Sequence, residues 1–239
     1  MITDMDIESN NIQLNLAEIK ENIANAAKKS GVVDIQKIML VAVTKTFDAQ
    51  TAKKAVDLGV MDLGENKVQE FLDKNGEVNC AFWHMIGHLQ TNKVKYIVNK
   101  NFAEKIKLIQ SLESVKLAAE IDRRAKDAGI TANCLIEINI AGENSKYGVP
   151  PEEAMLFAKS LEMFENIRVK GLMCVAPFTV NPENNRGLFA EMRGLFGKMR
   201  ETEKCKMEYL SMGMSGDYAV AIEEGANMVR IGTALFGGR

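Results

Sequence analysis

The chain has 239 residues, of which 46% are hydrophobic and 26% are charged, and its 30 Lys and Arg nearly balance its 32 Asp and Glu. This composition is typical of a globular protein with a sizeable core. A formal net charge of -2 argues against a nucleic-acid-binding protein, whose surface is usually basic. No apolar run approaches the roughly 20 residues that span a bilayer, and the acidic start of the chain lacks a signal-peptide pattern, so we expect a cytoplasmic protein.

The cysteines and histidines do not indicate a metal site. The four cysteines are widely spaced and form no C-x-x-C pair, and the chain has only two histidines, His84 and His88. We therefore expect no bound metal and interpret Cys80, Cys134, Cys174 and Cys205 as small buried residues. Chemistry in this protein must come from another residue type or from a cofactor.

The N-terminal stretch predicts an amphipathic helix. Ile12, Leu16, Ile19 and Ile23 recur at steps of three and four residues, and Gly31 ends the pattern. No Pro-rich linker, low-complexity segment or charge block follows, and the chain has four prolines. We therefore expect residues 1–239 to form one domain.

After the N-terminal helix, short apolar runs alternate with helical patterns. The expected strands are Ile38–Val43, Val60–Leu63, Phe82–Ile86, Lys107–Ser111, Cys134–Asn139, Val169–Val175, Glu208–Met212 and Met228–Ile231. The fourth is the weakest, because it mixes lysines with apolar residues and could instead extend a helix. Eight strand–helix units of this kind predict an α/β protein, a (β/α)8 TIM barrel. A doubly wound open sheet is the alternative, but it usually has a glycine-rich turn after its first strand, where this chain has residues 44–47.

Lys45 directly follows the first apolar run. Functional residues of such barrels gather at the C-terminal ends of the strands. Partial burial there would disfavour the ammonium form and free the amine for Schiff-base formation. A solvated lysine at a strand end is the commoner alternative, so position alone does not decide the role of Lys45.

Two loops rich in glycine and hydroxyl side chains follow the seventh and eighth strands. They are residues 211–217, with Ser211 and Ser215, and residues 230–238, with Gly232 and Thr233. Barrels commonly bind phosphate after these two strands, where exposed backbone N–H groups point toward the ligand. The alternative is that both are only tight turns, with Asp217 as a helix N-cap. A lysine amine opposite a phosphate site suits either a sugar phosphate, as in Schiff-base aldolases, or pyridoxal 5'-phosphate (PLP).

Several motifs together carry a family resemblance. They are residues 42–45, 63–66, 83–93, 171–173, 211–217 and 229–237, of which the run from Trp83 to Lys93 and the Arg-Ile-Gly-Thr-Ala segment are the most specific. In this order they resemble the pyridoxal phosphate homeostasis protein family, whose fold is similar to the N-terminal barrel domain of alanine racemase. Gln110 departs from the pattern, because many relatives have histidine there.

The resemblance implies a role for each candidate residue. It implies that Lys45 carries PLP as a Schiff base and that Asn66 lies near the cofactor rather than capping the next helix. It implies that Ser211 or Ser215, with the backbone at Gly232 and Thr233, holds the phosphate. It also implies that Arg230 faces the pyridine nitrogen, where a permanent cation would keep that nitrogen unprotonated and make the ring a poorer electron sink.

The chain ends at Arg239, where alanine racemase continues into a second domain that completes its dimeric active site. We therefore expect an open cofactor, a monomer, and a protein that buffers PLP or delivers it to apo-enzymes, with no catalytic residue. A slow amino-acid racemase is the alternative, and Tyr147 is the least implausible acid or base for it. A class I aldolase would need a proton relay near Lys45, for which Glu137 is the residue to check.

Overall fold

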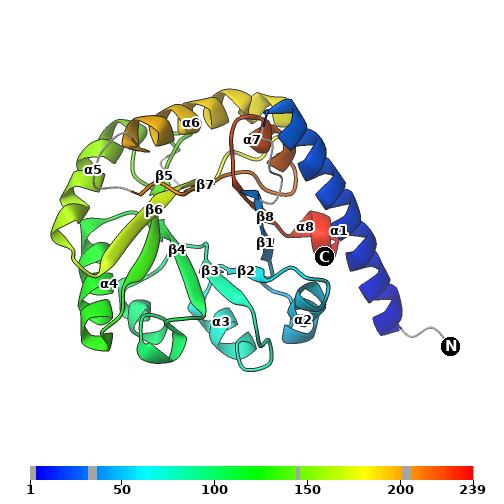
Figure 1. Cartoon of the computed structure of the whole chain (residues 1–239), viewed down its shortest axis with the longest axis horizontal. Coiled ribbons are helices and arrows are strands. Elements are labelled where there is room, and N and C mark those ends of the chain that lie inside the picture. The colour runs from blue at the N-terminus through cyan, green and yellow to red at the C-terminus, as the bar shows by residue number, and fades with distance from the viewer. Residues whose placement is uncertain (1–3, 32–36, 144–145, 201–205, 239) are drawn as a thin grey trace.

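The computed structural model describes residues 4–31, 37–143, 146–200 and 206–238. Eight parallel strands close into a barrel in sequence order, β1 to β8, and β8 pairs with β1. Helices surround the barrel on the outside (Figure 1). This arrangement confirms the predicted (β/α)8 barrel and excludes the open sheet.

The strands are short, as expected for a barrel whose walls are buried on both sides. They are β1 Met39–Val43, β2 Asp62–Glu65, β3 Phe82–Met85, β4 Ile106–Leu112, β5 Ala132–Ile138, β6 Ile167–Cys174, β7 Tyr209–Ser211 and β8 Met228–Ile231. The α-helices are α1 Asp4–Lys29, α2 Ala49–Asp57, α3 Val68–Lys74, α4 Val115–Ala128, α5 Ala154–Ser160, α6 Arg186–Arg200, α7 Tyr218–Glu223 and α8 Thr233–Phe236. Short 3-10 helices complete several connections: η2 Thr91–Tyr96, η3 Lys100–Phe102, η4 Pro151–Glu153, η5 Leu161–Met163 and η6 Pro182–Asn185.

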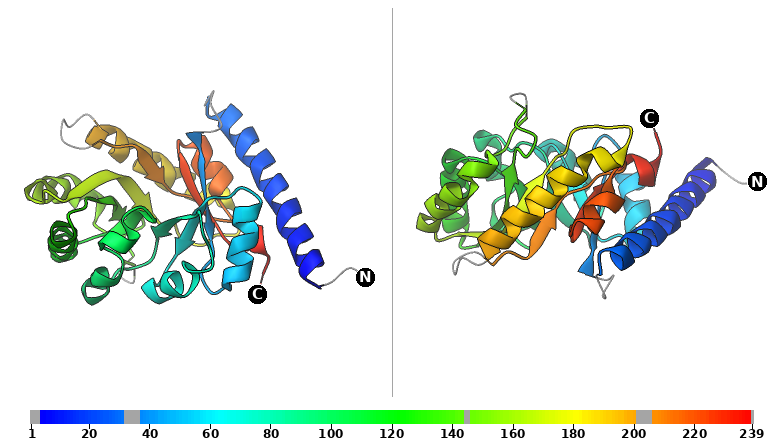
Figure 2. Two further views of the ribbon diagram at one scale, coloured as in Figure 1. Left: turned by 60° about the horizontal axis from the view of Figure 1, so that its bottom comes forward. Right: turned by 90° about the horizontal axis from the view of Figure 1, so that it is seen from above.

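Helix α1 lies outside the ring, beside α7 and α8 (Figures 1 and 2). The predicted stripe of Ile12, Leu16, Ile19 and Ile23 is buried there, which confirms the amphipathic helix. Gly31 follows it with a φ of 77°, a conformation that suits glycine at a helix end. Helix α1 thus covers the seam at which the first and last strands pair.

The structure corrects the second strand, which begins and ends two residues later than predicted. The predicted strand ended at Leu63, but Gly64 and Glu65 also belong to β2, and Gly64 pairs with Val43. Glu65 can end a buried strand because its carboxylate finds two hydrogen-bond donors inside the protein. The uncertain fourth strand is confirmed as β4, although its register shifts against both β3 and β5, and Gln110 on it is fully buried.

The apolar residues form two cores. The larger core lies between the strands and the outer helices, whereas Val41, Leu108, Leu135, Met173 and Met228 form a small cluster of their own. Cys134 and Cys174 are buried as expected, but Cys80 is exposed in a turn, where its φ is 67°, and Cys205 lies outside the described residues. Within the described ranges, no helix is long and apolar enough to cross a membrane.

Candidate functional site

Lys45 lies in a tight turn directly after β1. Its side chain is half-buried, and the next residue, Thr46, has a φ of 66°, which is unusual for a residue with a side chain. The turn is closed by a hydrogen bond from Phe47 N to Thr44 O (3.1 Å), and Thr46 N donates to Glu70 Oε1 (3.2 Å). The backbone on both sides of Lys45 is therefore held in place.

A buried ion pair supports this turn from below. Lys74 Nζ donates to Glu65 Oε1 and to Thr44 O, both at 2.7 Å, and Thr44 Oγ1 donates to Glu65 Oε1 at 2.6 Å. Burial raises the pKa of Glu65 to about 7, against the opposing effect of the bonds from Lys74 and Thr44. Sequence reasoning missed Lys74, because its position on α3 gives no signal that its ammonium group reaches back to β1.

Ser215 Oγ accepts two hydrogen bonds from the backbone that follows β8, and we call this oxygen the Ser215 acceptor point. The N–H groups of Gly232 and Ala234 both donate to Ser215 Oγ, at 3.2 Å and 3.1 Å. Gly232 also packs closely on β1, since a Cβ at this position would lie 3.3 Å from Val43 Cβ and from Val43 O. This contact places the loop beside the strand that leads to Lys45, and Thr233 begins α8 there.

Asp217 braces the loop that carries Ser215. Its carboxylate accepts Met214 N at 2.7 Å and Asn185 Nδ2 at 2.9 Å. It stands at the N-cap position of α7 but makes no side-chain capping hydrogen bond, so it holds the loop rather than capping the helix.

Ser211 and Arg230 lie together in the barrel interior, apart from this acceptor point. Arg230 is 3% exposed and donates from Nη1 to Ser211 Oγ (2.6 Å) and from Nη2 to Cys174 O (2.7 Å). Burial lowers the pKa of Arg230, and the charges of Glu137 and Asp217 act in the opposite direction. A guanidinium has five donors, so three remain after these two bonds.

Asn66 follows β2 at the same end of the barrel. It is not the N-cap of α3, a position held by Lys67. Gly87 packs tightly on it, since a Cβ there would lie 2.6 Å from Asn66 O. Asn66 and His88 help to line a cavity of about 500 Å³, whose other lining residues come from α3 and its N-cap and from the segment between β3 and the end of η2.

The rim opposite β1 carries acids and aromatic rings. Glu137 on β5 is 9% exposed, and its Oε2 has no hydrogen-bond partner among the described residues. Burial and the charge of Glu113 raise the pKa of Glu137 to about 7, and Arg230 acts against them. His88 Nδ1 lies 2.9 Å from Glu113 Oε1, and its ring stacks on Tyr147 with centroids 3.9 Å apart.

The C-terminal end of the barrel therefore combines an amine with an anion-binding type of loop. Lys45, Asn66, Ser215, Gly232 and Thr233 all lie on the segments that follow β1, β2, β7 and β8. Ser211 and Arg230 contribute from the barrel wall below them. An amine can bind a carbonyl covalently, and converging N–H and O–H groups suit phosphate oxygens.

Comparisons with known proteins identify the family. A family model described as "Alanine racemase, N-terminal domain" matches residues 14–239. A pyridoxal phosphate homeostasis protein of Aquifex aeolicus is 41% identical over 94% of this chain and 96% of its own length. One of Pseudomonas aeruginosa is 36% identical over 94% of both chains. The chain belongs to the pyridoxal phosphate homeostasis protein family.

Solved structures agree with this family. PipY of Synechococcus elongatus, solved with PLP bound, has a TM-score of 0.80 and 28% identity over 95% of this chain and all of its own. A Bifidobacterium adolescentis protein described as unknown has a TM-score of 0.88 and 30% identity, covering 98% and 97% of the two chains. Alanine racemase of Clostridium difficile, at 19% identity and a TM-score of 0.75, shares the fold over 96% of this chain and 60% of its own. The family and the racemase-like barrel that the motifs indicated are both confirmed.

Proposed function

We propose that this protein binds PLP, holds it as a Schiff base on Lys45, and buffers or delivers it inside the cell. The observation that carries the proposal is the contact between Gly232 and Val43, which sets the Ser215 acceptor point beside the strand that ends at Lys45. The PLP-bound PipY structure, which matches the chain over 95% of its length, supports the same ligand.

The residues present suit this cofactor. Ser215, rather than Ser211, would hold the phosphate with the backbone of Gly232 and Thr233, because Ser211 Oγ is fully buried and bonded to Gln110 and Arg230. Asn66 would contact the cofactor from the loop after β2. Arg230 would direct a remaining N–H toward the ring nitrogen and keep that nitrogen unprotonated.

PLP would supply an aldehyde carbon, to which the Lys45 amine would bind covalently with loss of water. The chain's own residues then orient the bound molecule at its phosphate and at its ring. A cation at the ring nitrogen discourages broad carbanion chemistry. We therefore propose binding without turnover, in one domain spanning residues 1–239.

We also propose a location, an oligomeric state and recipients for this protein. We propose that it acts in the cytoplasm as a monomer and that apo-PLP enzymes are its recipients. The alternative is a slow amino-acid racemase, for which the racemase-like fold is the supporting observation. Measured interconversion of D- and L-alanine that disappears in Lys45→Ala would favour that alternative.

Titration with PLP tests the binding proposal. Wild-type protein freed of ligand should gain a visible absorption band that survives gel filtration. Lys45→Ala should not gain it, whereas Lys100→Ala, which removes an exposed lysine on η3, should behave as wild type. A wild-type protein that gains no band, or a Lys45→Ala protein that gains the same band, would contradict the proposal.

A further inference from the structure

A continuous chain of hydrogen bonds crosses the barrel interior below the site. From Arg230 it runs through Ser211 Oγ to Gln110 Oε1 (2.7 Å), and from Gln110 Nε2 to His84 Nδ1 (3.0 Å). From His84 Nε2 it reaches Asp62 Oδ1 at 2.9 Å, which also accepts Lys107 Nζ at 2.7 Å. Ser211, Gln110 and His84 are all fully buried, so water does not compete for these bonds.

The two ends of this chain differ in position and in charge. Asp62 and Lys107 stand near the starts of β2 and β4, at the N-terminal end of the barrel, and their side chains are partly exposed. Although burial opposes ionisation of Asp62, the bonds from His84 and Lys107 lower its pKa. Arg230 lies near the end of β8. The chain therefore links a carboxylate at one end of the barrel with a guanidinium near the other.

The sulfur atom of Met228 determines which group donates and which accepts in each hydrogen bond of this chain. Gln110 Nε2 also lies 3.2 Å from Met228 Sδ. A thioether sulfur can only accept a hydrogen bond, so the amide nitrogen must face Met228 and His84, and the amide oxygen must face Ser211. His84 Nδ1 then accepts, and its proton lies on Nε2, which donates to Asp62. Burial lowers the pKa of His84, in agreement with this neutral ring.

The same assignment of donors and acceptors determines the orientation of the Ser211 hydroxyl group. Its hydroxyl hydrogen must point to Gln110 Oε1, so its lone pairs are left to accept from Arg230. A carboxylate in place of Gln110 could accept from Ser211 but could not donate to His84, and an apolar residue could do neither. Both ends of the chain are thus satisfied only by a side chain that accepts on one side and donates on the other.

We propose that Gln110 is a positioning residue that acts through Ser211 on Arg230. By holding Ser211 Oγ as an acceptor, it fixes the guanidinium and leaves its remaining N–H groups available to the pyridine nitrogen of the ligand. The inference rests on the proposed function, because it assumes a PLP ring above Arg230. Gln110 touches no ligand itself.

The test is a double-mutant cycle of Gln110→Met and Ser211→Ala, read by the absorption spectrum of bound PLP at several pH values and by its release rate. Each single variant should shift the band and its pH dependence and release PLP about tenfold faster, as expected when the hydrogen bond between Ser211 and the charged Arg230 is removed or no longer held in place. The double variant should be no worse than the worse single variant, because both changes break one chain. Gln110→Glu should shift the band as well, whereas Gln50→Glu, at an exposed position of α2, should not.

The outcomes separate the inference from the function on which it rests. If borohydride reduction of PLP-loaded wild-type protein leaves no adduct on Lys45, the proposed function is wrong, and so is the inference that rests on it. If wild type binds PLP but the folded variants keep its spectrum and release rate, or the two changes are additive, the function stands and the positioning role of Gln110 is wrong. Circular dichroism checks that each variant is folded, and Ser211→Ala, which removes one oxygen atom, carries the test if Gln110→Met does not fold.

Discussion

Ser215 Oγ accepts hydrogen bonds from two backbone N–H groups, those of Gly232 and Ala234, and in the proposed complex it would lie against the phosphate of PLP. We predict that Ser215→Asp folds normally, because its carboxylate can accept the same two N–H groups. Its negative charge should repel a phosphate dianion and weaken PLP binding at least tenfold, while binding of pyridoxal, which has no phosphate, changes little. Titration by absorption with both ligands measures the difference.

Ser114→Asp is the matched control for this prediction. Ser114 also accepts a backbone N–H, from Leu117, but it follows β4, which lies across the barrel from β8. The control should keep wild-type affinity for both ligands. Equal losses of PLP and pyridoxal in Ser215→Asp would show that the acceptor point does not hold the phosphate.

Glu137 should make the stability of the ligand-free protein depend on pH. Burial raises its pKa from 4.5 to about 7, so the folded state favours the protonated carboxyl. The contribution of protonated Glu137 to the free energy of unfolding is therefore fully present below pH 4.5 and is lost as the pH rises toward 7. Relative to Glu137→Gln, wild type should lose about 2 kcal/mol of unfolding free energy between pH 4.5 and 7. Urea unfolding of both proteins at several pH values tests this, and parallel curves would contradict it.

The sequence could predict the positions of some site residues but not the contacts of others. Lys45, Ser215 and Gly232 follow apolar runs, and the barrel places the ends of all strands at one face. The burial of Glu65 and Glu137 could not be predicted, because it depends on which side chains from other strands surround them. The chain of bonds through Gln110 also depends on the register between strands, which no local pattern encodes.

At the scale of elements, α3 is fastened to the turn after β1 by the Lys74–Glu65 pair. We predict that Lys74→Met destabilises the protein by about 3 kcal/mol, because it leaves a buried carboxyl without its cation. The double variant Lys74→Met with Glu65→Gln should recover part of this loss. Chemical unfolding of the three proteins provides the measurement, and a Lys74→Met protein as stable as wild type would contradict the role of the pair.

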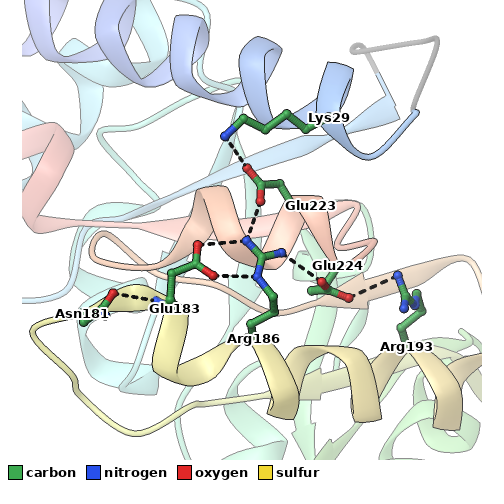
Figure 3. A network of polar contacts seen from close by, with 7 residues as sticks. All are labelled: Lys29, Asn181, Glu183, Arg186, Arg193, Glu223 and Glu224. Atoms are coloured by element: carbon green, nitrogen blue, oxygen red, sulfur yellow. Dashed lines mark hydrogen bonds and ion pairs between the residues drawn. The ribbon is translucent and has the colours of Figure 1, made fainter.

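A second network joins α6 and η6 to α7 and α1 (Figure 3). Arg186 donates to Glu183, Glu223 and Glu224, and Glu223 also accepts Lys29 from α1. The hydrogen bonds with these three glutamates raise the pKa of Arg186, so it stays charged. The network therefore helps to hold the N-terminal helix against the closing units of the barrel.

We predict that Arg186→Met lowers the unfolding free energy by about 1 kcal/mol at low salt, a modest value because the side chain is partly exposed and screened. The loss should shrink in 1 M NaCl. Arg123→Met, which removes an exposed arginine within α4, should cost less. Thermal and urea unfolding at both salt concentrations test the order, and a loss that does not respond to salt would point to packing instead.

At the scale of the whole molecule, closing the barrel brings the first and last thirds of the chain together. Strand β8 pairs with β1, and α1 covers α7 and α8 on the same side (Figure 1). The alternation of strands and helices predicted this closure, because eight such units form a barrel. The two-residue error in β2 arose because polar residues ended the apolar run before the strand itself ended.

The central claim is that Lys45 holds PLP covalently. The most direct measurement is borohydride reduction of the PLP-loaded protein, followed by peptide mass mapping. We predict one phosphopyridoxyl adduct, on the peptide that contains Lys45, and its absence from Lys45→Ala. An adduct confined to another lysine, or no adduct on a folded wild-type protein saturated with PLP, would contradict it.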